Sequence, residues 1–279
     1  MDVRRLLFEL ILSDGAELER VSAAVYPNLE NLQAVLAAAP RLQAFNTRVM
    51  GRSRELLPVL RSDPPYGPMQ VSELLVFGRD ASAEDLHALA AAVAAHESLE
   101  GLDLYLVNSA RELNALVDAA AERRVSDLQL DQCVVDDQTV PALARLLQLS
   151  SLTNLDIVCA DFPHEESVPV LCTALRACHT LTHLKLCVTP PDGANRHTVK
   201  DLIDAAAELP ALCELDLCGS KMLDHAAGNA AGRALGALLR ADLPSFHTLI
   251  VNDCQIGQAG LVALLNGLAA NTHLRKLEC

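Results

Sequence analysis

The chain has 279 residues and carries 22 Lys and Arg against 36 Asp and Glu, a formal net charge of −14. A protein that follows nucleic-acid phosphates needs clustered Lys and Arg, so this charge argues against a DNA- or RNA-binding protein. Hydrophobic residues make up 51% of the chain and aromatic residues only 3%, so it can bury a large core built mainly from Leu and Ala, which excludes a disordered protein.

The first apolar segment, residues 6–12, is interrupted by Glu9 and ends at the turn of residues 13–15. It is far shorter than the ~20 apolar residues that a membrane-spanning helix needs, so we expect no membrane span and no membrane partner. Arg4 and Arg5 precede it, as in a signal peptide. The charge inside the segment and the missing small-residue cleavage pattern favour an amphipathic capping helix instead.

One pattern, L-x-x-L-x-L with aliphatic substitutions, recurs along most of the chain. Its copies begin at 71, 99, 125, 152, 181, 212, 246 and 274, in steps of 28, 26, 27, 29, 31, 34 and 28, and a weaker copy begins at 42. The last two apolar residues of a copy lie two apart, so both point to the same side of a short strand. Each copy therefore predicts a strand with one core face and one open face.

Ala-rich stretches lie between these strands and carry helix-start signals. Three of them predict capping boxes, at Ser82-x-x-Asp85, Ser109-x-x-Glu112 and Thr198-x-x-Asp201. Three glycines spaced by four, Gly228, Gly232 and Gly236, indicate a helix face that a second helix approaches closely. A strand–helix unit cannot bury its Leu face alone, so the units must stack into a curved solenoid.

With this period the chain resembles leucine-rich repeat proteins of the long, ribonuclease-inhibitor-like subtype. The resemblance covers residues 71–279 well and residues 18–70 poorly. Cys133, Ser220 and Cys254 stand where that family has a buried Asn or Cys after the strand. The resemblance implies an α/β horseshoe with a parallel β-sheet on the concave face and α-helices on the convex face.

The domain organisation follows from these copies. We expect an N-terminal helical cap and degenerate first repeat over residues 1–41, and one continuous solenoid over residues 42–279. The last copy stops at Cys279, halfway through a unit, which suggests a fragment of a longer chain or an end that a partner covers. Nine scattered cysteines, an odd number, are typical of a reducing compartment such as the cytoplasm.

The sequence contains none of the common nucleotide-binding or catalytic motifs. We therefore expect a non-enzymatic protein without catalytic residues, cofactor or metal. His179, His183 and Cys187 have a ligand-like spacing, but the segment passes from the end of a helix into a strand. The three side chains would then not converge on one ion.

The family resemblance assigns partner contacts to the open face of the strands. The candidate partner-binding residues on that face are Glu73, Leu75, Phe77, Asp103, Tyr105, Asp127, Gln129, Asp131, Asn154, Asp156, His183, Lys185, Glu214 and Asp216. Neighbouring strands lie ~4.8 Å apart, so these side chains should form mainly acidic rows, with Lys185 between Asp156 and Asp216. Phe77 and Tyr105 are either a binding anchor, or Phe77 lies under a loop and the acids are a solvated surface.

These features suggest two functions. The first is a protein–protein interaction scaffold that binds a basic protein or peptide on an acidic concave surface. The second is the substrate-recognition part of a larger ubiquitin-ligase-like adaptor, or of a bacterial effector that acts in the host cytoplasm. A weaker resemblance links the subtype to Ran GTPase-activating proteins, but the chain lacks their acidic tail and no Arg can be assigned to catalysis.

Overall fold

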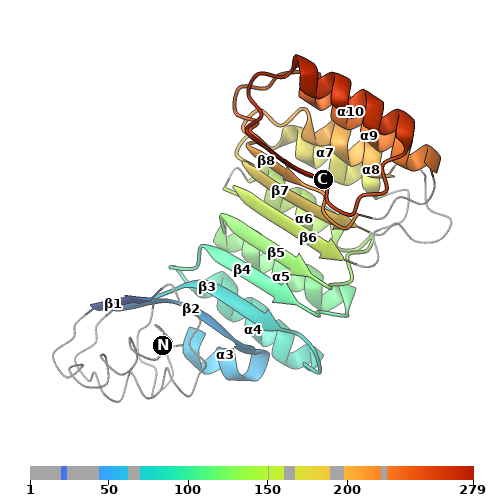
Figure 1. The fold of residues 1–279 in the computed structure, drawn as a ribbon. Helices are drawn as coiled ribbons and strands as arrows, with labels where there is room; N and C mark the ends of the chain where they lie inside the picture. The colour runs from blue at the N-terminus through green and yellow to red at the C-terminus, as the bar shows by residue number, and fades with distance from the viewer. Residues whose placement is uncertain are drawn as a thin grey trace, which may run out of the picture.

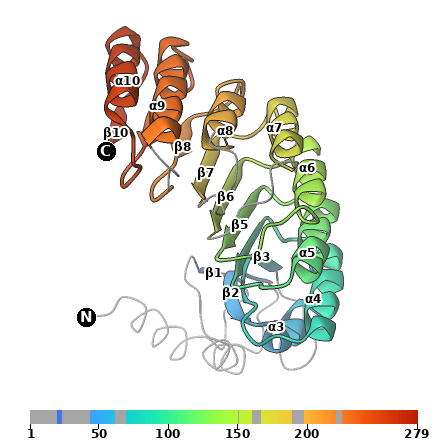
Figure 2. The same ribbon diagram turned by 90° about the vertical axis from the view of Figure 1, so that its right-hand side faces the viewer.

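The computed structural model describes residues 20–23, 44–61, 70–149, 151–159, 167–188, 198–220 and 225–279. These residues form stacked strand–helix units that wind into an open arc (Figure 1). A parallel sheet lines the concave side and the helices cover the convex side, as the resemblance implied (Figure 2). The apolar segments predicted as an N-terminal cap lie outside the described residues, so the boundary between residues 41 and 42 stays a prediction.

The strands of the described residues form one sheet, in which each pairs in parallel with the strands before and after it in sequence. They are β1 (Arg20–Ala23), β2 (Ala44–Arg52), β3 (Gln70–Phe77), β4 (Gly101–Tyr105), β5 (Asp127–Asp131), β6 (Asn154–Cys159), β7 (His183–Val188), β8 (Glu214–Asp216), β9 (Thr248–Ile250) and β10 (Lys276–Glu278). This order without crossovers is what stacking of one repeated unit produces.

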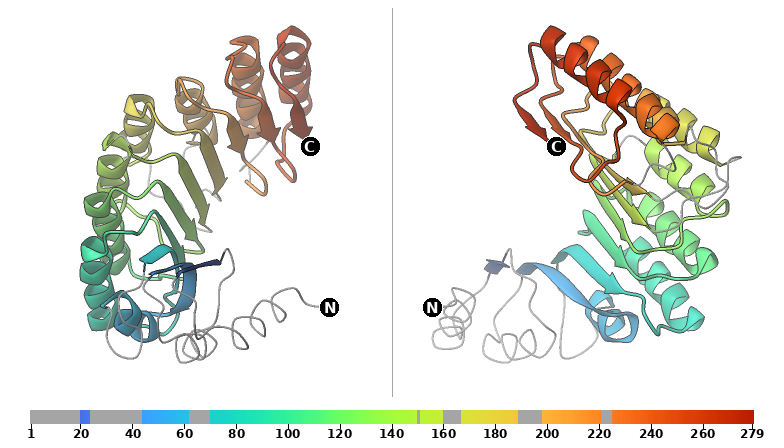
Figure 3. Two further views of the ribbon diagram at one scale, coloured as in Figure 1. Left: turned by 90° about the vertical axis from the view of Figure 1, so that its left-hand side faces the viewer. Right: turned by 45° about the vertical axis from the view of Figure 1, so that its right-hand side comes forward.

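The helices connect successive strands and pack side by side along the outside of the arc (Figure 3). They are α3 (Ser53–Leu60), α4 (Ala83–Ala95), α5 (Ala110–Arg123), α6 (Val140–Gln148), α7 (Val168–Ala177), α8 (Thr198–Ala206), α9 (His225–Arg240) and α10 (Gln258–Ala270). In the part of the chain that the structure describes, no helix has both the length and the apolar character needed to cross a membrane.

The core lies between the sheet and the helices and is built from the repeated aliphatic positions. In β5, Leu128 and Leu130 are fully buried, whereas Gln129 between them is exposed. Each fully buried Leu stabilises the fold by roughly 1.5–3 kcal/mol, so the repeated pattern supplies most of the driving force for stacking. The predicted alternation of core and open faces is therefore confirmed.

In three units, the residue after the strand joins the unit to the one before it. Cys133 Sγ donates to the carbonyl oxygen of Leu104 at 3.3 Å, Ser220 Oγ to that of Leu186 at 2.6 Å, and Cys254 Sγ to that of Leu217 at 2.9 Å. Burial raises the pKa of the Cys133 thiol to about 11 and that of the Cys254 thiol to about 12. Both thiols therefore keep the proton that they donate.

The weak copy that begins at 42 is displaced in the structure. Val49 and Gly51, rather than Phe45 and Thr47, pair with the core residues Leu74 and Val76 of β3. A register shift between Thr47 and Arg48 interrupts the pairing of the long strand β2. The sequence pattern carries no signal for such a bulge, which adds a residue to one strand only.

The predicted capping boxes are partly wrong. Ser82 caps α4, because its Oγ accepts a hydrogen bond from the Asp85 N–H at 3.1 Å. Ser109 precedes α5, but its hydroxyl donates to the carboxylate of the buried Glu112 instead of accepting from the backbone. Helix α8 already includes Thr198 as its first residue, so Thr198 is not its N-cap.

The predicted glycine face lies between α9 and α10. A Cβ atom on Gly232 would lie 2.5 Å from the Cα atom of Gly260, and one on Gly236 would lie 2.2 Å from the carbonyl oxygen of Ala263. Both neighbours are backbone atoms, which cannot move aside as a side chain can. The close approach of the two helices therefore depends on glycine at these positions.

Candidate functional site

The open face of the sheet, here called the inner face, carries three rows of side chains that run across the strands. Strand pairing aligns Glu73, Gly101, Asp127, Asn154, His183, Glu214 and Thr248 in the first row; Leu75, Asp103, Gln129, Asp156, Lys185, Asp216 and Ile250 in the second; and Phe77, Tyr105, Asp131, Val158 and Cys187 in the third. All fourteen predicted partner-binding residues lie in these rows and none is buried. Their role in binding remains a prediction.

Carboxylates surround one lysine at the centre of the inner face. Lys185 lies between Asp156 and Asp216 in the second row, and its Nζ is 3.4 Å from Asp216 Oδ2. Partial burial raises the pKa of Asp156 to about 6, and Lys185 opposes this effect while neighbouring carboxylates add to it. Partial burial lowers the pKa of Lys185, but Asp216 and Asp156 outweigh it, so the net direction is upward.

The first row contains a carboxylate, Asp127, in which only one of the two oxygens accepts a hydrogen bond from the described residues. Asn154 Nδ2 donates to Asp127 Oδ2 at 2.9 Å, while Asp127 Oδ1 is buried without a hydrogen-bond partner among the described residues. Gly101 separates Asp127 from Glu73, and a Cβ atom on Gly101 would lie 2.9 Å from Glu73 Cγ. The side chain of Glu73 thus extends over Gly101 toward Asp127, which concentrates negative charge at this point.

Two aromatic rings meet where β3 and β4 end. Phe77 and Tyr105 pair in register, with ring centroids 5.8 Å apart and ring planes at 86°. Gln132 Nε2 donates to the Tyr105 hydroxyl at 3.2 Å. Both rings are only partly buried, so the edge-to-face pair presents an apolar surface to solvent in a fixed orientation.

The backbone just after these strands adopts an unusual conformation. Leu106 has a φ of 57° and Gln132 a φ of 51°, a left-handed region that costs a non-glycine residue roughly 1–2 kcal/mol. Their N–H groups donate to carbonyl oxygens of the next strand, Leu106 to Asp131 at 3.0 Å and Gln132 to Val158 at 2.6 Å. These bonds hold Gln132 beside Tyr105.

A charged hollow that the sequence did not reveal adjoins the aromatic pair, and its lining is balanced, with Glu55, Asp80 and Asp85 beside three arginines. Arg52 at the end of β2 pairs in register with Phe77, and it lines this hollow of about 250 Å³ together with Arg54 and Arg79. Arg54 Nε is bound to Asp85 Oδ2 at 2.6 Å. The displaced register of β2 is the reason that Arg52 was missed. A larger hollow of about 620 Å³ lies between α5 and α6 and contains none of the predicted residues.

Within the described ranges, no group of three or more His, Cys, Asp or Glu side chains could hold a metal ion. His179 lies in the turn before β7, His183 begins that strand, and Cys187 is near its end. The three therefore lie along an extended segment.

The parallel strand–helix units stack, and Cys133, Ser220 and Cys254 form a ladder of hydrogen bonds between successive units. Together these features define a leucine-rich-repeat-like solenoid. Among solved structures, the chain is similar to Rad7 in the crystal structure of the Rad7 and Elc1 complex in yeast, with a TM-score of 0.55 and 13% sequence identity over 99% of this chain and 70% of that chain. At this identity the likeness shows the fold alone.

The other comparisons add little. Similarity to leiomodin-1 actin-binding site 2, with a TM-score of 0.35, 16% identity and coverage of 67% of this chain and 88% of that chain, is too low to carry an argument. No protein-family model and no curated protein matches the sequence.

Proposed function

We propose that the protein is a non-enzymatic interaction scaffold whose inner face binds a basic segment of a protein partner. The observation that carries this proposal is the charge of the three aligned rows. Among the fourteen predicted residues, seven are Asp or Glu and one is Lys. The seven acidic residues are Glu73, Asp103, Asp127, Asp131, Asp156, Glu214 and Asp216.

An extended basic chain suits this arrangement. In the second row Asp103, Asp156 and Asp216 lie on every second strand, about twice the ~4.8 Å strand spacing apart, so cationic groups of a partner at that spacing can each meet an acceptor. Charges of this kind speed association and select the partner more than they strengthen the final complex. Affinity then depends on apolar contacts that exclude water.

The aromatic pair supplies such a contact. Phe77 and Tyr105 are already held against each other, so little side-chain freedom is lost when a partner covers them. We infer that an aliphatic or aromatic residue of the partner packs here, while its Lys and Arg residues extend over the acidic rows. The anchor hypothesis is thus preferred over a purely solvated surface.

The ribonuclease-inhibitor-like subtype and a cytoplasmic location belong to the same proposal. The ladder of Cys133, Ser220 and Cys254 supports the subtype, since these residues stand where that family has its buried Asn or Cys. Free thiols support a reducing compartment, because the described cysteine side chains form no disulfide.

A second candidate function is the substrate-recognition part of a larger ubiquitin-ligase-like adaptor or effector protein. Its support is the likeness to Rad7, which was solved as a complex with Elc1. In that case the inner face would hold the substrate and another surface would hold the adaptor. Co-purification of a second, constant subunit that still binds when the inner face is altered would favour this candidate.

Random peptides displayed on phage and selected on the purified chain test the main proposal. We expect enrichment of Lys and Arg together with an apolar residue. For a selected peptide, Asp103→Lys with Asp156→Lys should slow association about 10- to 100-fold and flatten its salt dependence, because steering is lost. Tyr105→Ala should mainly speed dissociation.

The matched control makes the same charge change on the helical side. Asp118→Lys with Asp204→Lys alters two half-exposed carboxylates of α5 and α8, which lie on the convex side. Equal slowing by both pairs of changes would show that net charge, and not the inner face, governs binding. Selection of acidic peptides would overturn the proposal directly.

A further inference from the structure

The acidic residues of the second row lie on alternate strands. Strand pairing places Asp103 on β4, Asp156 on β6 and Asp216 on β8, with Gln129 and Lys185 between them. Neighbouring strands lie ~4.8 Å apart, so these carboxylates recur about every 9.6 Å along the row. A linear partner that meets two of them at once must present cationic groups at this distance, on one side of its backbone.

The regular conformations of a peptide place side chains on one side at different distances. In a β-strand every second side chain faces the same way, about 6.7 Å apart. In an α-helix, residues seven apart share a face and lie about 10.5 Å apart. In a polyproline II helix every third side chain faces the same way, about 9.3 Å apart. Over two steps this last spacing departs from the acidic row by only about 0.6 Å, against about 1.8 Å for the α-helix.

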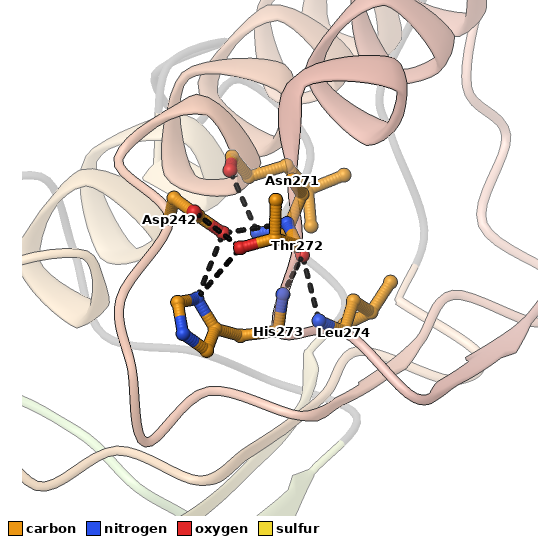
Figure 4. Close-up of polar contacts among 6 residues, drawn as sticks. Asp242, Asn271, Thr272, His273 and Leu274 are labelled. Atoms are coloured by element: carbon orange, nitrogen blue, oxygen red, sulfur yellow. Dashed lines mark hydrogen bonds and ion pairs between the residues drawn. The ribbon is translucent and has the colours of Figure 1, made fainter.

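Asp156 can accept hydrogen bonds from such a partner. None of the described residues donates a hydrogen bond to its carboxylate, and burial, together with neighbouring carboxylates, raises its pKa to about 6. Asp242, in the turn after α9, shows the opposite arrangement (Figure 4). It accepts hydrogen bonds from the N–H and the hydroxyl of Thr272, each at 2.7 Å, and lies 3.0 Å from His273 Nδ1. These contacts lower the pKa of Asp242 to about 2, and a cation over Asp156 would act in the same direction.

Lys185 ends the part of the row that a partner's cations can use. Its Nζ lies 3.4 Å from Asp216 Oδ2, and the side chain of Asp216 is only 13% exposed. The charge of Asp216 is therefore balanced within the chain. The cations of a partner are then expected over Asp103 and Asp156, which lie on the other side of Lys185.

The aromatic pair lies beside the β4 end of this stretch. Tyr105 is two residues after Asp103 on the same strand, and Phe77 pairs with Tyr105 in register. In a polyproline II helix, the residues next to a cation that points into the row project sideways, toward the third row. Proline suits this place, because its ring is apolar and its fixed φ preserves the conformation. Surfaces lined by aromatic rings are typical of sites that bind polyproline II segments.

We propose that the basic segment bound by the inner face adopts the polyproline II conformation, with Lys or Arg at positions i and i+3 over Asp103 and Asp156. A proline next to the first cation packs against the aromatic pair. This rests on the proposed function, because it specifies the conformation and the spacing of the same basic segment. A segment that already has this conformation loses little backbone freedom on binding, so more of the contact energy becomes affinity.

Three fluorescent peptides of identical composition test the spacing. Each holds two Arg residues in a chain that is otherwise proline, and the two are two, three or four positions apart. The prolines keep all three peptides in the polyproline II conformation. Fluorescence anisotropy with the full chain measures binding. We expect the three-position spacing to bind at least about 5-fold more tightly than the others, because in those one Arg misses its carboxylate.

Variants of the protein test where the cations lie. Asp156→Asn should abolish the preference among the three peptides. A third Arg at position i+6 should add little affinity for the native chain, but about 5-fold for Lys185→Gln, since Asp216 then meets it. Lys200→Gln is the matched control. The side chain of Lys200 on α8 has the same 37% exposure as that of Lys185, and it also pairs with a carboxylate. This variant should gain nothing from the third Arg.

The outcomes separate this inference from the proposed function. Equal affinity for the three spacings, or tighter binding of an Ala-rich helical peptide with two Arg seven positions apart, overturns the polyproline II conformation but not the binding of a basic segment. A spacing preference that survives Asp156→Asn overturns the placement of the cations. No gain from the third Arg with Lys185→Gln overturns the limit set by Lys185. If no basic peptide binds the native chain, the proposed function itself fails. Circular dichroism confirms that each variant is folded.

Discussion

The charge at the centre of the inner face makes the protein less stable at neutral pH, and Asp156→Asn measures this effect. Burial raises the pKa of Asp156 from 3.8 to about 6, with Asp127, Asp216 and Glu214 adding to the rise against Lys185. The folded protein thus disfavours the ionised carboxylate. Asn has nearly the same shape and no charge, so the variant should lose the electrostatic cost and keep the packing.

The magnitude follows from the change in pKa. A rise from 3.8 to about 6 sets a ceiling of about 3 kcal/mol. Because the side chain is only partly buried, solvent screens the carboxylate, and about 1 kcal/mol is expected instead. A raised pKa in the folded state means that the stabilising contribution is complete below pH 3.8 and is lost as the pH rises through about 6.

Urea unfolding followed by circular dichroism at a series of pH values measures the difference between the two proteins. We expect the advantage of Asp156→Asn to be near zero at about pH 4 and to reach about 1 kcal/mol above about pH 7. Asp253→Asn, which removes an exposed carboxylate outside the rows, controls for net charge. A constant difference at all pH values, or a variant less stable than the native chain at pH 8, would refute the argument.

Two further changes test how the units are joined. Ser220→Ala removes the donor to the Leu186 carbonyl and should lower the free energy of unfolding by about 1–2 kcal/mol. Ser220→Cys should keep most of the stability, because thiols donate the equivalent bond in other units. The midpoints of urea unfolding distinguish the two variants. Gly232→Ala places a methyl group against the Gly260 backbone. Although Ala has the better helix propensity, we expect the free energy of unfolding to fall by about 1–3 kcal/mol. Unchanged hydrogen-exchange protection of α10 would contradict this.

The repeated pattern predicts the fold from residue 71 onward because each apolar position of the pattern occupies the same place in the core of every unit. Leu102, Leu128 and Leu155 pair with one another across the sheet, so the rows of the inner face follow from counting residues alone. The neighbours of Lys185 were predicted in the same way. Periodicity thus determines which residues lie side by side, although it says nothing about whether a partner binds them.

Features that belong to one unit only could not be predicted. His96 is buried, its Nε2 accepts a hydrogen bond from the Val71 N–H at 3.2 Å, and burial lowers the pKa of the ring. Arg52 pairs in register with Phe77 only because an extra residue in β3, Ser72, shifts the pairing of β2 with β3. Tertiary contacts decide these positions, and no local pattern encodes them.

The helices of the arc pack mainly against the helices just before and after them, and the strands do the same. A small rotation between adjacent units therefore changes few contacts, yet it accumulates along the length of the molecule. The curvature of the arc can therefore increase or decrease at a small cost in free energy. Such a change would let the inner face fit ligands of different width. The glycine-packed junction of α9 and α10 would be the stiffest section of the arc, so bending should concentrate toward its middle.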